Sequence, residues 1–132
     1  SWKFAPEEAE KTPRILNNGR LIPHWPCRTG VLVDGGKAYC AMGLLPWENC
    51  YLCRLDAKTG VPEYVESHDS VTLEGAVAAG KDRLYIPQGR LPPLLFDKAT
   101  GKQVGSLQNG GGCFVLVTPD ATAVAVRPGP RG

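Results

Sequence analysis

An internal repeat constrains the fold of this chain more than any other feature of its sequence. Residues 56–60 and 97–101 both follow the pattern D-x-x-T-G, and the two segments start 41 positions apart (97 minus 56). The Asp of such a segment can hydrogen-bond to the backbone that follows it, and the Gly can take the left-handed conformation. Each segment therefore predicts a tight turn, and the short apolar runs on both sides of it predict strands.

The apolar runs recur in the same order around both turns. In the first unit, approximately residues 31–65, the predicted strands are 31–33, 37–42, 50–55 and 61–65. In the second unit, approximately residues 77–107, they are 77–79, 83–87, 94–96 and 104–107, and an incomplete third unit covers approximately residues 114–126. Four short strands in about 40–45 residues is the period of a β-propeller blade. We therefore expect an all-β fold of about two to three four-stranded antiparallel blades, which is a partial β-propeller.

The chain is expected to have two parts. Residues 1–20 are polar, and Pro6 and Pro13 confine any helix between them to about one turn, so this stretch is interpreted as an N-terminal arm or connecting segment. Residues 21–132 form the expected partial propeller. Propellers typically have about four to eight blades, so this part cannot close a ring by itself. The other blades would come from copies of the chain or from a longer polypeptide of which this chain is a piece.

Charge and hydropathy exclude two classes of partner. The formal net charge is only +2, and acidic residues are interspersed with Lys and Arg along the chain. This is not the basic footprint of a protein that binds nucleic acid. No apolar run approaches the roughly 20 residues that a membrane-spanning helix needs. We expect no nucleic-acid partner and no membrane-spanning segment.

The chain has five cysteines, which are Cys27, Cys40, Cys50, Cys53 and Cys113. An odd number does not suit a fully paired secreted scaffold, and we interpret the cysteines as buried small apolar groups. One or two disulfides remain an alternative, and the spacing does not define their pairing. Cys50 and Cys53 form a C-x-x-C pattern in a predicted strand, where residues three apart point to opposite faces, so we expect no metal site there.

Both turns resemble a known repeat. Residues 56–60 and 97–101 look like the A-x-D-x-x-T-G-x-x-x-W turn of pyrroloquinoline-quinone (PQQ) type propellers. Residues 20–60, with their hairpin and the strand before the first turn, resemble large propeller proteins of planctomycete type. The resemblance covers residues 20–126 and implies a propeller fold in a periplasmic or otherwise exported protein.

Departures from this repeat limit what it implies about function. In the family, the Trp of the pattern docks one blade on the next; Tyr64 and Gly105 hold that position here, and only Tyr64 can dock. Quinoprotein dehydrogenases of the family also place an adjacent pair of cysteines against their cofactor, and this chain lacks such a pair. We therefore expect no cofactor and no catalytic residue. The alternative is a fragment of a PQQ-dependent oxidoreductase that binds PQQ with calcium.

Four residues are candidates for binding. Arg28 and Arg90 follow loops rich in Pro or Gly, where a guanidinium facing a central channel could hold a carboxylate in bidentate fashion. The more common role of such an Arg is to bond loop carbonyls. Trp25 and Trp47 are candidates for a binding surface, with packing between blades as the alternative.

These observations favour a non-catalytic scaffold or interaction module of unknown ligand, within a larger exported PQQ-like repeat protein. The expected partners are other blades of the same propeller or copies of the chain, and a separate protein partner is the further alternative. Because an isolated blade leaves one sheet face uncovered, function would depend on several blades together.

Overall fold

Antiparallel strands build almost all of the fold, and one helix of five residues, α1 (Glu7–Lys11), precedes them. The computed structural model describes residues 1–11, 14–45, 47–108, 111–112, 114–120 and 123–125. The expected all-β fold class is confirmed within these ranges, and all named strands pair in antiparallel fashion. The sheets do not close into a ring in the described part of the chain.

Each of the two complete predicted units forms one four-stranded sheet. The first sheet has the order β3-β4-β5-β6, made of β3 (Leu32–Asp34), β4 (Lys37–Met42), β5 (Cys50–Asp56) and β6 (Pro62–His68). The second sheet has the order β10-β9-β8-β7, made of β7 (Ala78–Ala79), β8 (Arg83–Gln88), β9 (Leu91–Asp97) and β10 (Gln103–Ser106). Strands that follow one another in the chain are neighbours in both sheets, so each sheet is a meander.

Two short hairpins flank the four-stranded sheets. They are β1 (Arg14–Asn17) with β2 (Arg20–Pro23), and β11 (Val115–Val117) with β12 (Ala123–Ala125). The first hairpin crosses the expected boundary at residue 20. Its turn contains Asn18 and Gly19, with φ values of 49° and 74°. Asn-Gly between apolar runs is a strong hairpin signal, which accounts for the formation of this hairpin in a stretch interpreted as an arm.

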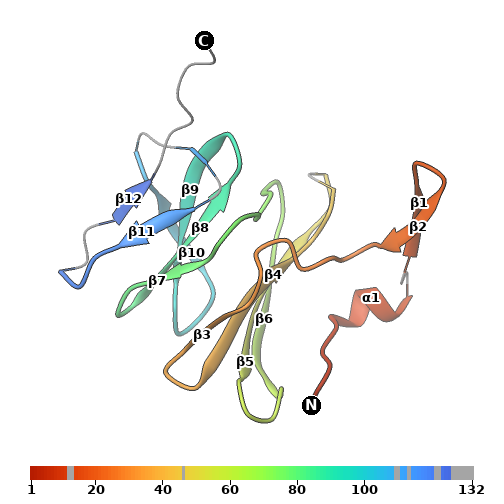
Figure 1. Ribbon diagram of the computed structural model, residues 1–132, viewed down its shortest axis with the longest axis horizontal. Coiled ribbons are helices and arrows are strands. Elements are labelled where there is room, and N and C mark those ends of the chain that lie inside the picture. The colour runs from red at the N-terminus through yellow and green to blue at the C-terminus, as the bar shows by residue number, and fades with distance from the viewer. Residues whose placement is uncertain (12–13, 46, 109–110, 113, 121–122, 126–132) are drawn as a thin grey trace.

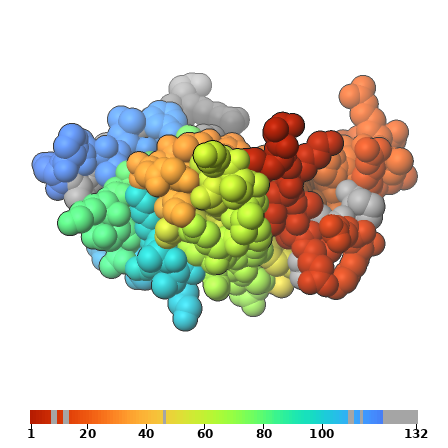
Figure 2. Space-filling model, turned by 90° about the horizontal axis from the view of Figure 1, so that it is seen from below, coloured from red at the N-terminus to blue at the C-terminus, as the bar shows by residue number. Residues whose placement is uncertain are grey.

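These parts follow one another along the molecule. Helix α1 and the β1–β2 hairpin lie at one end, the first sheet is next, the second sheet follows, and β11–β12 lies at the other end (Figure 1). The space-filling view shows the same progression from the N-terminal segment to the C-terminal strands (Figure 2). Strand β11 contacts β7 and β8, so a third structural unit begins directly against the second sheet.

Strand β9 is longer than the predicted strand at residues 94–96. It begins at Leu91, which lies opposite Gln88 of β8, and it includes Pro92 and Pro93. A proline has no backbone N–H but keeps a carbonyl that accepts hydrogen bonds. The side-chain Nε2 of Gln88 donates to the Pro92 carbonyl over 2.9 Å. The two prolines are tolerated in this strand because their carbonyls still find donors.

The main hydrophobic core lies between the two four-stranded sheets. Leu52 of the first sheet and Leu84, Ile86 and Phe96 of the second sheet are 0% exposed. Leu73, in the connection between the sheets, joins the same cluster. Burying a side chain of this size contributes about 1.5–3 kcal/mol, so this shared core is a large stabilising term for both sheets.

A second core covers the opposite face of the first sheet. It contains Ala38, Cys40, Tyr51, Cys53 and Leu55 of β4 and β5, with Phe4 and Trp25 packed against it. Strands β4 and β5 are therefore buried on both faces, which explains their nearly continuous apolar sequences. The N-terminal segment, interpreted from sequence as an arm, supplies part of the cover.

The predicted burial of the cysteines is confirmed for Cys40, Cys50 and Cys53 and is wrong for Cys27, which is exposed. Cys50 belongs to the core between the sheets and Cys53 to the second core, so they point to opposite faces of β5 as expected. Cys27 lies in the connection ahead of β3 and belongs to neither of the two cores formed by the described residues. Cys113 lies outside the described residues.

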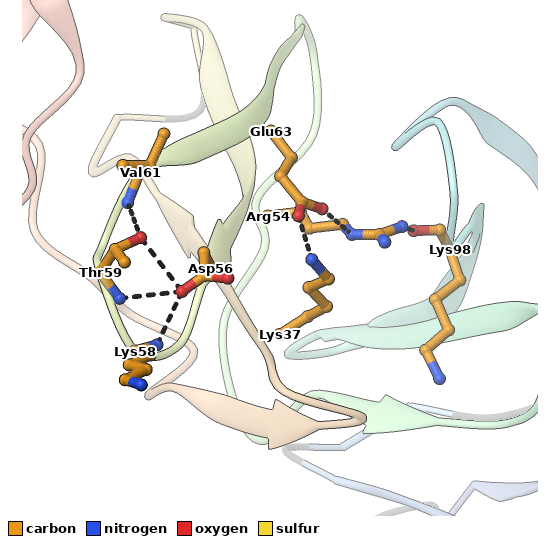
Figure 3. Close-up of polar contacts among 8 residues, drawn as sticks. All are labelled: Lys37, Arg54, Asp56, Lys58, Thr59, Val61, Glu63 and Lys98. Atoms are coloured by element: carbon orange, nitrogen blue, oxygen red, sulfur yellow. Dashed lines mark hydrogen bonds and ion pairs between the residues drawn. The ribbon is translucent and has the colours of Figure 1, made fainter.

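The two D-x-x-T-G turns have the same hydrogen bonds. Asp56 Oδ1 accepts from the backbone N–H groups of Lys58 (2.9 Å) and Thr59 (2.8 Å), and from the Thr59 hydroxyl (3.0 Å; Figure 3). Asp97 Oδ1 accepts three bonds from the equivalent groups of the second turn, at 2.9–3.0 Å. Bonds from Thr59 and Thr100 hold the pKa values of the two carboxyls below their ordinary range, because the donors favour the charged form.

The lowered pKa of Asp97 makes a pH-dependent contribution to stability. A carboxyl with a depressed pKa stabilises the fold above its unfolded-state pKa of about 3.9, and this contribution is lost as the pH falls through the folded-state value. Asp97→Asn is therefore expected to be less stable than the parent chain at pH 7, and the difference should disappear towards pH 2. Urea unfolding followed by tryptophan fluorescence at several pH values measures this.

The matched control is Lys102→Gln, which alters a nearby charge without removing a donor to Asp97. It should leave the acid dependence unchanged. A difference between Asp97→Asn and the parent that stays constant down to pH 2 would contradict the assignment of the charged carboxyl as the stabilising form.

Candidate functional site

The surface where the first sheet meets the turn of the second is the most elaborate polar site in the described part of the chain. Tyr64 of β6 reaches across, and its hydroxyl donates to the Lys98 carbonyl over 3.2 Å. The Tyr64 ring lies on Gly101, so close that a Cβ at residue 101 would lie 2.5 Å from a ring carbon. Gly101 has a φ of 73°, which favours glycine. Tyr64 thus docks on the turn of the next unit.

His68, at the end of the same strand, strengthens this contact. Its Nε2 donates to the Gly101 carbonyl over 2.9 Å, and its ring meets Phe96 edge-on with 4.9 Å between centroids. Burial raises the pKa of Tyr64 above its ordinary value, so its hydroxyl stays protonated and remains a donor. Two side chains of β6 therefore bond two backbone carbonyls of one turn.

The first turn receives an aromatic residue in the same way. The Trp2 indole Nε1 donates to the Ala57 carbonyl over 3.1 Å, and a Cβ on Gly60 would collide with the indole ring. Ala57 holds the position in the first turn that Lys98 holds in the second. Each D-x-x-T-G turn thus pairs with one aromatic hydrogen-bond donor, which rests on its glycine. We call these two contacts the aromatic docking contacts.

An ionic network lies beside the Tyr64 contact. The Glu63 carboxylate sits between Lys37 and Arg54, with 2.6 Å from its Oε2 to Arg54 Nε (Figure 3). Arg54 extends to the second sheet, where its guanidinium donates to the Lys98 carbonyl over 3.2 Å. The Lys37 ammonium, and Arg54 with it, hold the pKa of Glu63 below its ordinary value. This network connects the two sheets through polar groups.

The Lys98 side chain extends from the second turn and contacts the first sheet. Its ammonium pairs with Asp34 and donates to the Gly80 carbonyl over 3.1 Å. The same ammonium and the Arg54 guanidinium lie 5.8 Å and 5.9 Å from the centre of the Tyr39 ring, within the range of cation–π attraction. A cleft of about 320 Å³ opens here, with acidic and basic side chains of both sheets in its walls. Lys98 pairs with Asp34 across this cleft, and Lys37 and Arg54 in its walls pair with Glu63 beside it, which suits a structural joint.

Arg28, a candidate ligand-binding residue, lies in a second joint between the units. Its guanidinium pairs with Glu74 and donates to the Leu44 carbonyl over 3.4 Å. Its own carbonyl accepts from the Gly75 backbone N–H over 3.1 Å. Arg28 and Glu74 come from the connections that lead into β3 and β7. The geometry therefore agrees with the common role of such an Arg, which is to bond loop carbonyls.

The other candidate residues lie apart from this joint. Arg90 is exposed in the turn between β8 and β9, and no described contact joins it to Arg28. Trp25 stacks on His24, with 4.6 Å between ring centroids, and meets Tyr51 edge-on at 5.3 Å. It packs on the second core, on the face of the first sheet that points away from the second sheet, so this contact is not packing between the two four-stranded sheets. Trp47 is 77% exposed and remains available to a partner.

His24 forms a further polar contact beside Trp25. Its Nε2 lies 2.5 Å from Glu48 Oε2, and this pair ties the segment after β2 to the loop between β4 and β5. Within the described ranges, no group of three or more His, Cys, Asp and Glu side chains is arranged to hold a metal ion. Nor does any described helix have the length and hydrophobicity needed to cross a membrane.

Sequence reasoning identified Tyr64 and Arg28 but missed most of their partners. Trp2 lies in a stretch interpreted as an arm. Its separation from Gly60 in the sequence matches no repeat or strand period that would predict their contact. Glu63 and Glu74 are ordinary acids in a strand and a loop. Glu63 meets Lys37 and Arg54 only when β4, β5 and β6 pair, and Glu74 meets Arg28 only when the connections before β3 and β7 come together. No protein-family model, curated protein or solved structure matches this chain.

Glycine substitutions can measure the aromatic docking contact. Gly101→Ala is expected to lower the free energy of unfolding by about 2–5 kcal/mol, because the left-handed backbone costs about 1–2 kcal/mol and overlap with Tyr64 adds about 1–3 kcal/mol. Gly36 has the same φ of 73°, but no atom lies within 4 Å of its would-be Cβ. Gly36→Ala should therefore lose only about 1–2 kcal/mol, which is the backbone contribution. Urea denaturation of both variants provides the comparison.

A third variant completes the set. At Gly105 φ is not positive, and no atom lies within 4 Å of the Cβ that a substitution would add. The stability of Gly105→Ala should therefore stay close to that of the parent chain. Equal losses for Gly101→Ala and Gly36→Ala would mean that the ring of Tyr64 moves aside at little cost, and that the docking contact is weak.

Proposed function

We propose that this chain forms two consecutive blades and the beginning of a third blade of a β-propeller that resembles the PQQ type, and that it acts as a non-catalytic scaffold. The observation that carries the proposal is the contact of Tyr64 with Gly101. Tyr64 holds the position of the family's docking Trp, and it rests on the D-x-x-T-G turn of the following unit. A contact of this kind supports repetition of the unit around an axis.

The polar contacts of the site support a structural role. Arg54 donates to the Lys98 carbonyl and Lys98 pairs with Asp34 across the two sheets, and Glu63 pairs with Arg54 within the first sheet. Catalysis by a nucleophile would instead need a Ser, Cys or Lys beside an oriented base. The groups described here are engaged in joining the sheets, so the proposed function is to hold blades in register and to present their loops.

The proposed partners are further blades, contributed by copies of the chain or by a longer polypeptide. Trp47, exposed on the loop between β4 and β5, is the proposed contact for a separate protein partner. The exported or periplasmic location is part of the same proposal, and it rests on the resemblance of the turns. Packing of one blade on the next would account for the buried inner face of β4 and β5, whereas Phe4 and Trp25 cover their outer face.

The non-catalytic part of the proposal has a direct test. The purified chain is incubated with PQQ and Ca²⁺, and quinone absorbance and dye-linked alcohol oxidation are measured. We expect no retained quinone after gel filtration and no oxidation above a protein-free control. Retained quinone together with alcohol oxidation would contradict the scaffold and favour a quinoprotein oxidoreductase.

The native mass of the chain tests ring formation by copies of itself. If copies complete the ring, native mass spectrometry should detect one discrete species of about two or three chains, enough for a propeller of about four to eight blades. Tyr64→Ala, which removes the docking ring, should shift that species towards smaller assemblies or unfolded chain. A folded monomer would exclude a ring made of copies and leave the longer polypeptide as the source of the remaining blades.

A further inference from the structure

Three cysteine side chains gather on the outer face of the first sheet. Cys40 of β4 and Cys53 of β5 are direct partners across the antiparallel ladder, and both belong to the second core. Cys27 lies in the connection before β3, and its backbone bridges that of Met42, two residues after Cys40. Residues two apart in a strand share a face, so the bridge brings Cys27 to the side of β4 that carries Cys40.

The thiols are close enough to affect one another. Interaction with the Cys40 thiol, together with burial, raises the pKa of Cys27 above its ordinary value. The Cys27 and Cys53 thiols act on Cys40 in opposite directions, and with burial the pKa of Cys40 rises to about 12. Cys40 is thus the middle member of a row of three thiols.

The three thiols differ in their access to solvent. Cys27 is exposed, and its Sγ lies 3.2 Å from the Gly30 carbonyl. Cys40 is 2% exposed and Cys53 is 0% exposed, so both are shielded from reagents in solution. Cys50 faces the core between the sheets and is separated from the row by the sheet itself. A reagent from solvent can therefore reach this row only through Cys27.

We propose that Cys27 and Cys40 form a thiol-oxidation site that reacts with low-molecular-weight disulfides, with Cys27 as the entry thiol and Cys40 as the resolving thiol. In the first step the Cys27 sulfur, as thiolate, attacks oxidised glutathione, forms a mixed disulfide and releases one reduced glutathione. In the second step the Cys40 sulfur attacks the Cys27 sulfur, forms the Cys27–Cys40 disulfide and releases a second glutathione. Two protein thiols are oxidised, one glutathione disulfide is reduced, and the two thiol protons pass to the two glutathione thiolates.

The cross-link would tie the connection that carries Arg28 to strand β4. It closes a loop of about 14 residues around β3 and its hairpin, which restricts the unfolded chain and raises the melting temperature. The raised pKa values keep both cysteines in the thiol form near neutral pH. Because the thiolate is the attacking species, the reaction should accelerate as the pH increases.

The test uses the full folded chain, reduced and then incubated with oxidised glutathione at pH 8.5. Intact mass is recorded first, free thiols are then alkylated in denaturant so that the buried ones also react, and peptide maps are recorded without reduction. We expect loss of two alkylatable thiols, a mass lower by about 2 Da, a Cys27–Cys40 peptide pair, and a melting temperature several degrees higher than that of the reduced chain.

Two variants make the assignment specific. Cys27→Ser, at the exposed position, should form no cross-link under the same conditions, whereas Cys53→Ser should still form the Cys27–Cys40 pair. Glutathione that stays on Cys27 with Cys40 still alkylatable would overturn the proposal. So would a cross-link in Cys27→Ser, or a link from Cys27 to Cys113.

Discussion

The face-to-face packing of the two four-stranded sheets is the contact on which the rest of the structure depends. Leu52 from one sheet meets Leu84, Ile86 and Phe96 from the other in a core that neither sheet could form alone. The first sheet also has an apolar outer face, and the N-terminal segment covers it through Phe4 and other side chains. A strand buried on both faces needs a neighbour on each side, which is the physical reason for stacking.

Apolar packing holds the sheets together without specifying how they are oriented. Orientation depends on groups with directional bonds, and Tyr64 and His68 provide them by donating to carbonyls of the second turn. Glycine at residue 101 lets the Tyr64 ring approach the backbone, because any Cβ would occupy the same space. The ion pairs around Glu63 are partly exposed, and partly exposed pairs contribute little to the free energy of unfolding. Their main effect is to orient the Lys37 and Arg54 side chains.

Much of this fold could be predicted from local pattern. The two D-x-x-T-G turns and the apolar runs around them predicted two four-stranded antiparallel units, because turns and strand alternation depend on neighbouring residues. The β1–β2 hairpin also had a local signal, Asn18-Gly19, that was not used. The candidate site was predicted less well. Arg28 and Trp25 were identified as candidates, yet their partners Glu74 and Tyr51 are more than 20 positions away and follow no period.

The sequence by itself determined where the chain turns and which faces of its strands are apolar, since both depend on residue type and short spacing. The tertiary structure alone decided what lies on each glycine turn, which charges meet across the sheets, and which cysteines share a face. Those outcomes depend on segments distant in the chain, such as Trp2 and Gly60, that come together only when two sheets stack. The exposure of Cys27 beside the buried Cys40 is a further example. The two cysteines come to lie on one face, and differ in solvent exposure, only when the strands and connections are assembled.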